Sequence, residues 1–161
     1  MPEYRFVTIW RMDAPVDRVF DLIEDAMAWP DWWPSVIAVE RIASGSEDHV
    51  GDIHRYTFRG RLPYLLRFDG RVTVREPPVT LEGTTTGELE GTGRWTLAAD
   101  GPRTVVRYEW NIRTTRWWMN LFAPLPFVAA IFRLNHHAVM RDGLDGARRR
   151  LGVAGSYERV E

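Results

Sequence analysis

The chain has 161 residues, a formal net charge of −1 at pH 7 and no cysteine. This length fits one domain with a sizeable core, the small net charge argues against a nucleic-acid binder, and the missing thiols exclude disulfides and thiolate chemistry. The N-terminus lacks a basic-then-apolar signal pattern, so we expect a cytoplasmic protein. The eight tryptophans suggest a cavity lined by flat rings, with a bulky solid core as the alternative.

The first third of the chain predicts a strand followed by two short helices. Residues 4–12 alternate as a strand does, with apolar side chains on both faces. Residues 13–15 then open a helix whose apolar side chains Val16, Val19, Phe20 and Ile23 share one face. The Pro- and Trp-rich residues 28–34 predict a short helix or turn that plugs one end of the core.

The middle of the chain predicts strands only. Inward and outward side chains alternate most clearly in residues 62–76, and turn residues separate each run from the next. The expected strands are residues 36–42, 52–59, 62–76, 79–88, 89–98 and 104–114. Strands that follow one another without intervening helices favour an antiparallel sheet.

Residues 117–151 predict an apolar, Pro-interrupted approach and then the longest helix of the chain. One stripe contains Phe127, Ile131, Leu134, Ala138 and Val139 together with Asn135, and a second, rotated stripe contains Met140, Leu144, Ala147 and Leu151. We expect the first stripe to face the core or a cavity. The apolar window is shorter than a membrane span and contains prolines, so no stable membrane insertion is expected.

Together these elements predict an α+β fold. A curved seven-stranded antiparallel sheet should wrap around the long C-terminal helix, with two short helices after the first strand. Residues 1–152 should form a single domain, and residues 153–161 should be a disordered tail.

Several segments carry a resemblance to a known family. The helix start at residues 14–20, the Trp-Pro-Asp-Trp-Trp-Pro segment at residues 29–34, the Val-Gly-Asp sequence at residues 50–52 and the final helix at residues 135–152 resemble the START/Bet v 1-like (SRPBCC) superfamily, specifically its polyketide cyclase/dehydrase and lipid-transport branch. The resemblance covers residues 3–152 and implies a helix-grip fold with a hydrophobic cavity between sheet and helix. It implies no invariant catalytic set, and we expect no cofactor.

Aromatic side chains in inward registers are the candidate ligand-binding residues. Two of them, Tyr56 and Tyr108, add polar hydroxyl groups to an otherwise apolar lining. The candidate set is Tyr56, Phe58, Phe68, Trp95, Tyr108, Trp110, Phe132 and Asn135. The alternative is that these rings fill a closed core.

The candidate catalytic residues form a small set: His54, Tyr56, Tyr108 and Asn135. His54 is either a hydrogen-bonded core histidine or an acid/base group, and Asn135 binds either a ligand carbonyl or strand backbone. His136 and His137 are adjacent and so about 100° apart on a helix, with no ligand at the spacing of a metal clip. No metal site is expected.

The apolar approach to the last helix is too hydrophobic for a plain surface loop. It contains the candidate entrance residues Trp117, Trp118, Phe122 and Phe127. Three interpretations stay open: a lid over the cavity, a gate that touches a membrane, and a dimer contact. The sequence favours the lid, with the dimer contact as its close rival.

Two functions of different classes follow. The first is a carrier that binds a hydrophobic small molecule such as a lipid, polyketide or aromatic compound, as a monomer or a homodimer. The second is a polyketide cyclase or dehydratase-like enzyme, a lyase or isomerase in which cavity His, Tyr and Asn side chains move protons. A closed interaction module is a third possibility. The shortage of converging acid/base groups favours the carrier.

Overall fold

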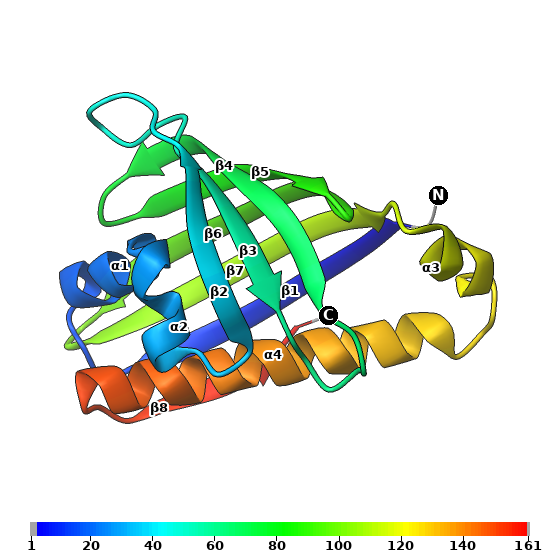
Figure 1. The fold of residues 1–161 in the computed structure, drawn as a ribbon. Coiled ribbons are helices and arrows are strands. Elements are labelled where there is room, and N and C mark those ends of the chain that lie inside the picture. Colours follow the sequence, from blue (N-terminus) through cyan, green and yellow to red (C-terminus); the bar gives the residue numbers. More distant parts are fainter. Residues whose placement is uncertain (1–2, 161) are drawn as a thin grey trace.

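The computed structural model describes residues 3–160. Figure 1 shows a strongly curved sheet around one long helix, α4, with α1 and α2 at one end of the sheet and α3 at the other. In chain order the elements are β1 (Glu3–Met12), α1 (Val16–Glu24), the 3₁₀ helix η1 (Ala26–Ala28), α2 (Trp29–Trp32), β2 (Val36–Ala43), β3 (Ile53–Phe58), β4 (Leu66–Glu76), β5 (Thr80–Gly87), β6 (Leu89–Asp100), β7 (Arg103–Thr114), α3 (Trp117–Phe122), α4 (Val128–Leu151) and β8 (Gly155–Arg159). The expected α+β helix-grip fold is confirmed.

The sheet is antiparallel and has eight strands in the order β2-β3-β4-β5-β6-β7-β1-β8. The prediction of seven strands and of a disordered tail at residues 153–161 was wrong for Gly155–Arg159, which pair with β1. Without β8, the backbone groups along that edge of β1 would have no strand partner. Tyr157 also anchors the strand, because its hydroxyl lies 2.5 Å from Nδ1 of His137 on α4. A five-residue strand is too short to leave a clear periodic pattern.

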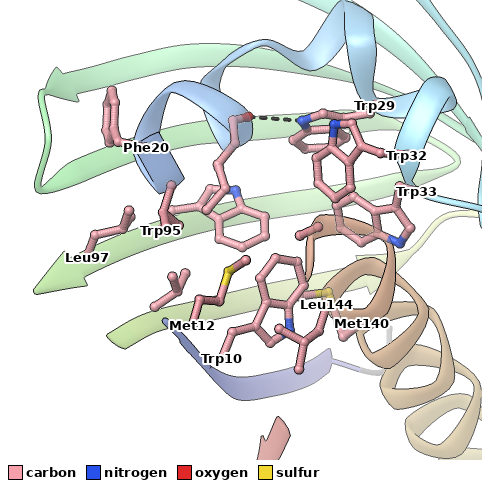
Figure 2. Packing of buried hydrophobic residues seen from close by; sticks show 14 of the residues in the cluster. Trp10, Met12, Phe20, Trp29, Trp32, Trp33, Trp95, Leu97, Met140 and Leu144 are labelled. Atoms are coloured by element: carbon pink, nitrogen blue, oxygen red, sulfur yellow. Dashed lines mark hydrogen bonds between the residues drawn. The ribbon is translucent and has the colours of Figure 1, made fainter. Parts of the chain in front are cut away.

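The Trp-rich segment plugs one end of the core, as predicted. Trp29, Trp32 and Trp33 are all at least nine-tenths buried and pack against Trp10 and Trp95 of the sheet, as Figure 2 shows. Two of the indole N–H groups are satisfied by backbone carbonyls: that of Trp29 donates to Ile23 at 3.0 Å, and that of Trp33 donates to Val139 at 2.9 Å. Buried donors with partners fix the position of each ring.

The buried face of α4 differs from the expected one. Phe127, Ile131 and Leu134, which were expected to face inward, are exposed. The buried side chains of the helix are instead Val128, His136, His137, Met140, Leu144 and Ala147. The second stripe of the sequence therefore faces the sheet, and two histidines continue it towards the N-terminus. A stripe search that scores only apolar residues misses a face that contains two histidines.

None of the helices in the described part of the chain is both long enough and apolar enough to cross a membrane.

Candidate functional site

A cavity of about 530 Å³ lies between the concave face of the sheet and α4. This volume is within the range of sites that bind drug-sized ligands. All the candidate ligand-binding residues line it: Tyr56, Phe58, Phe68, Trp95, Tyr108, Trp110, Phe132 and Asn135, and so does His54. The alternating patterns of the strands thus predicted the strand residues of this set, and α4 adds Phe132 and Asn135. Whether they bind a ligand stays a prediction.

The cavity wall is made of stacked rings from neighbouring strands. Trp95 and Tyr108 are directly paired across β6 and β7, and their ring centroids lie 4.2 Å apart at 26°. Tyr56 and Phe68 are paired across β3 and β4, with centroids 5.4 Å apart at 26°. Aromatic pairs at these cross-strand positions stabilise a sheet, and here they also present flat faces to the cavity.

Two hydroxyl groups stand out in this apolar lining. Those of Tyr56 and Tyr108 have no hydrogen-bond partner among residues 3–160, and burial raises the pKa of both phenols. Both tyrosines therefore keep their protons at neutral pH. Each can donate a hydrogen bond to an oxygen of a bound molecule.

One end of the cavity is charged and contains His54. Burial lowers the pKa of the His54 imidazole, and the Arg41 guanidinium lowers it further. The neighbouring Asp52 carboxylate accepts hydrogen bonds from the Gly45 N–H at 2.6 Å and faces Nδ1 of His49 at 3.0 Å. His54 is therefore a neutral imidazole at neutral pH. It was expected to be hydrogen-bonded if it were a core residue, but no partner lies among the described residues.

Asn135 lies at the opposite end and has a structural contact. Its Oδ1 accepts hydrogen bonds from the backbone N–H groups of Arg61 at 2.6 Å and Leu62 at 3.3 Å. The amide therefore ties the β3–β4 connection to α4, which is the backbone-binding alternative that the sequence left open. Its side chain still lines the cavity.

Sequence reasoning missed His136, which also lines the cavity. Its ring is stacked between Phe6, at 4.1 Å, and Trp110, at 5.4 Å between centroids, and its Nε2 is buried without a hydrogen-bond partner among the described residues. Burial lowers the pKa of this imidazole, and the nearby His137 lowers it further. The signal was available: His136 lies four residues from both Phe132 and Met140, on the face that proved to be buried.

The candidate entrance segment contacts the cavity through a different residue. Met119 of α3 is buried and lines the cavity, whereas Trp117, Phe122 and Phe127 are exposed. Trp118 packs edge-on against Tyr64 of the β3–β4 connection at 5.2 Å. The exposed side chains of this segment therefore do not cover the cavity in this structure.

Among the described residues, no group of three or more His, Asp or Glu side chains is placed to hold a metal ion.

Comparisons with known proteins give the same fold. The family model described as polyketide cyclase / dehydrase and lipid transport matches residues 7–152. The Zhui aromatase/cyclase from Streptomyces sp. R1128 is 18% identical over 93% of this chain and 96% of its own, with a TM-score of 0.71. A START superfamily protein from Mycobacterium smegmatis is 13% identical over 91% of this chain and 98% of its own, with a TM-score of 0.73.

A third similar structure is larger than this chain. The di-domain ARO/CYC BexL is 21% identical with a TM-score of 0.72, but the match covers 91% of this chain and only 49% of BexL. The chain thus spans about half of that protein. No curated protein sequence matches the chain.

Proposed function

Because the chain belongs to the polyketide cyclase/dehydrase and lipid transport family, we propose that it binds a ring-containing hydrophobic small molecule in the cavity between the sheet and α4. The observation that carries the proposal is the lining: stacked aromatic faces interrupted by the hydroxyl groups of Tyr56 and Tyr108, which have no hydrogen-bond partner among the described residues. Flat rings favour flat ligands, and a buried unpaired hydroxyl favours a ligand with an oxygen to receive its hydrogen bond.

The proposed ligand is therefore apolar over most of its surface and carries at least one carbonyl or hydroxyl oxygen. A ligand without such an oxygen displaces water from the cavity but leaves the hydroxyl groups of Tyr56 and Tyr108 without a hydrogen-bond partner. Each hydroxyl left unpaired in this way costs binding about 1–3 kcal/mol.

A matched pair of probes tests this. Anthracene and anthraquinone have the same three-ring frame, but only the quinone carries carbonyl oxygens. We expect anthraquinone to bind more tightly, as measured by quenching of tryptophan fluorescence. In the double variant Tyr56→Phe/Tyr108→Phe, the affinity for anthraquinone should fall about tenfold because two hydrogen bonds are lost, while the affinity for anthracene should rise because no hydroxyl is left unpaired.

The substitutions Ile37→Ser and Ile42→Ser on β2 are the matched control, since both side chains are exposed, outside the cavity lining. Equal losses for both probes in the tyrosine variant would mean that the hydroxyls do not contact the ligand. No binding of either probe, together with nothing bound to the purified protein in native mass spectrometry, would contradict the proposal.

The second candidate function is a cyclase or dehydratase, and the neutral His54 favours it. A neutral imidazole accepts a proton, and the protonated tyrosines hold or donate one. The similarity to the Zhui aromatase/cyclase supports this candidate at the level of the fold. The two functions differ in the mass of what leaves the cavity: a carrier releases a bound polyketone unchanged, whereas a dehydrating cyclase releases a product that lacks one water per new double bond. Mass spectrometry of the extracted ligand after incubation separates them.

A further inference from the structure

A group of apolar side chains is exposed around α3 and the start of α4. We name this surface the α3 tip; it consists of Leu65, Trp117, Leu121, Phe122, Leu125, Phe127, Ile131 and Leu134. Trp117 is 75% exposed and Leu121 62%, so neither side chain contributes much to the core. Single exposed apolar residues are ordinary, but a cluster of this kind marks an interaction surface.

The α3 tip carries no charge of its own. Residues 117–132 contain no Asp, Glu, Lys or Arg. Figure 1 shows α3 and its connection to α4 lying beyond the end of the sheet, so the segment projects from the body of the molecule. A projecting, uncharged, aromatic segment can enter an apolar medium without desolvating an ionised group.

The residues around the tip are strongly basic. Hydrogen bonds show that several of these residues lie beside one another at the α3 end. The Arg67 backbone N–H donates to the Glu88 carboxylate, and the Arg116 guanidinium pairs with the same carboxylate. The Arg133 guanidinium donates to the Arg5 carbonyl. The charged residues of this end are Arg5, Arg61, Arg67, Arg113, Arg116 and Arg133 on the positive side, and Glu3, Glu88 and Glu90 on the negative side.

This local excess contrasts with a net charge of −1 for the whole chain. Arg61 pairs with Asp142 further along α4, at 3.2 Å, and Glu90 pairs with Arg113. In the part of the chain that the structure describes, Arg5 and Arg67 form no ion pair. Two exposed guanidinium groups, those of Arg5 and Arg67, are thus available to an anionic partner.

We propose that the α3 tip is a docking site for an anionic lipid membrane surface. Trp117, Leu121 and Phe122 enter the boundary between headgroups and acyl chains, and the surrounding arginines contact the anionic headgroups. This is peripheral binding, consistent with the lack of a membrane-spanning helix among the described residues. The docking does not depend on what the cavity binds.

The charges favour a membrane over a second copy of the chain. In a two-fold symmetric dimer through the α3 tip, each surface would meet its own copy, and the two basic rims would face each other. Like charges brought together in this way disfavour association. An anionic bilayer supplies both the apolar layer and the opposite charge that this surface lacks.

Vesicle flotation with the full chain tests the proposal. The probes are vesicles of phosphatidylcholine alone and vesicles in which about a third of the lipid is phosphatidylglycerol. Since each surface arginine contributes about 1 kcal/mol at an anionic bilayer, we expect at least about tenfold tighter binding to the anionic vesicles. Raising the salt from about 0.1 M to about 0.5 M should weaken this binding, because the charges are screened.

Variants separate the contribution of the apolar side chains from that of the arginines. Trp117→Ser/Leu121→Ser should weaken binding to anionic vesicles about tenfold or more because less apolar surface enters the bilayer. Arg5→Gln/Arg67→Gln should reduce the preference for anionic over neutral vesicles. The control Ile37→Ser/Ile42→Ser removes comparably exposed side chains, 49% and 45%, from β2, and should bind vesicles as the unmodified chain does.

Circular dichroism and urea denaturation check that each variant is folded. Absence of binding of the unmodified, folded chain to the anionic vesicles would overturn the proposal without any variant. Equal binding to both kinds of vesicle, or equal loss in the β2 control, would also overturn it. A concentration-dependent dimer that Trp117→Ser/Leu121→Ser abolishes, with no vesicle binding, would assign the surface to a second copy instead.

Discussion

The two ends of the cavity use tryptophan in opposite ways. At the α2 end, Trp29 and Trp33 lie 5.0 Å apart and Trp10 and Trp95 lie 5.4 Å apart between ring centroids, and each is buried. Figure 2 shows these rings packed between the sheet and α4. At the α3 end, Trp117 is exposed to solvent.

The difference comes from the backbone around each ring, because the residue type is the same. At the α2 end, two helices, the sheet and α4 close on the indoles from several sides. At the α3 end, α3 touches the body of the molecule mainly through Met119 and Trp118. One end therefore provides stability, and the other leaves large apolar side chains available for binding. The following predictions test this contrast, beginning with the largest effect.

The same substitution at the two ends should have very different effects on stability. Trp10→Ala leaves a large cavity beside Trp33 and Trp95 and should lower the free energy of unfolding by about 3–5 kcal/mol. Trp117→Ala removes an exposed ring and should change it by no more than about 0.5 kcal/mol. Urea denaturation measures both. Similar losses for the two variants would mean that the α3 end is as tightly packed as the α2 end.

Gly146 allows the α2 end to approach α4. A Cβ at this position would lie 1.7 Å from the Trp32 carbonyl oxygen, and one at Gly143 would lie 2.5 Å from the Trp33 ring. Although alanine is the better helix former, Gly146→Ala should destabilise the protein by about 1–3 kcal/mol because helix and backbone must separate. Arg149→Ala, on the exposed side of the same helix, is the control. A stabilised Gly146→Ala variant would show that this contact is loose.

Acid should destabilise the protein through the buried histidines. The folded pKa of His136 lies below its usual value of 6.5, so the unfolded state takes up the proton first as the pH falls. The stability is complete above about pH 6.5 and should decline below it, by at most about 1.4 kcal/mol per pH unit for each such histidine.

His136→Phe keeps a ring between Phe6 and Trp110. It should remove the part of the acid-induced loss of stability that is due to His136 and leave the part that is due to His54. Urea denaturation between about pH 6.5 and about pH 5 measures the slope. If the unmodified chain and the variant have the same slope, His136 is not a buried neutral group.

A small effect is expected where the Asn135 amide joins the β3–β4 connection to α4. Asn135→Ala removes the acceptor for the Arg61 and Leu62 N–H groups and should lower the free energy of unfolding by about 1 kcal/mol. Both amides should then exchange with deuterium faster. Asn135→Asp keeps an acceptor oxygen and should protect them. Unchanged exchange in the alanine variant would contradict this contact.

Much of the cavity wall could be predicted from the sequence. Tyr56, Phe58 and Phe68 alternate with polar or charged residues, and a strand that alternates in this way has a single arrangement that buries its apolar face. The plug at residues 29–34 was predictable for a related reason, since several large indole side chains in one short Pro-rich segment favour burial in the core over exposure to water. The roles of His54 and of the two tyrosines towards a ligand stay predictions.

Other features depended on contacts that the sequence does not contain. His136 and His137 are buried because Phe6, Trp110 and Tyr157, from distant strands, surround them; without those neighbours they look like surface residues. Residues 155–159 form a strand because the edge of β1 lies beside them.

The sequence by itself determined which side of each central strand is apolar and that one long helix must cover the sheet. This follows from the local geometry of strands and helices, in which side chains repeat with fixed periods. Only the tertiary structure decided which face of α4 is buried, where the tail pairs, and that Trp117, Leu121 and Phe122 of α3 face outward while Met119 faces the cavity. These features depend on contacts between segments that are far apart in the sequence. The periodic pattern of apolar residues along one segment does not show which other segment it will contact.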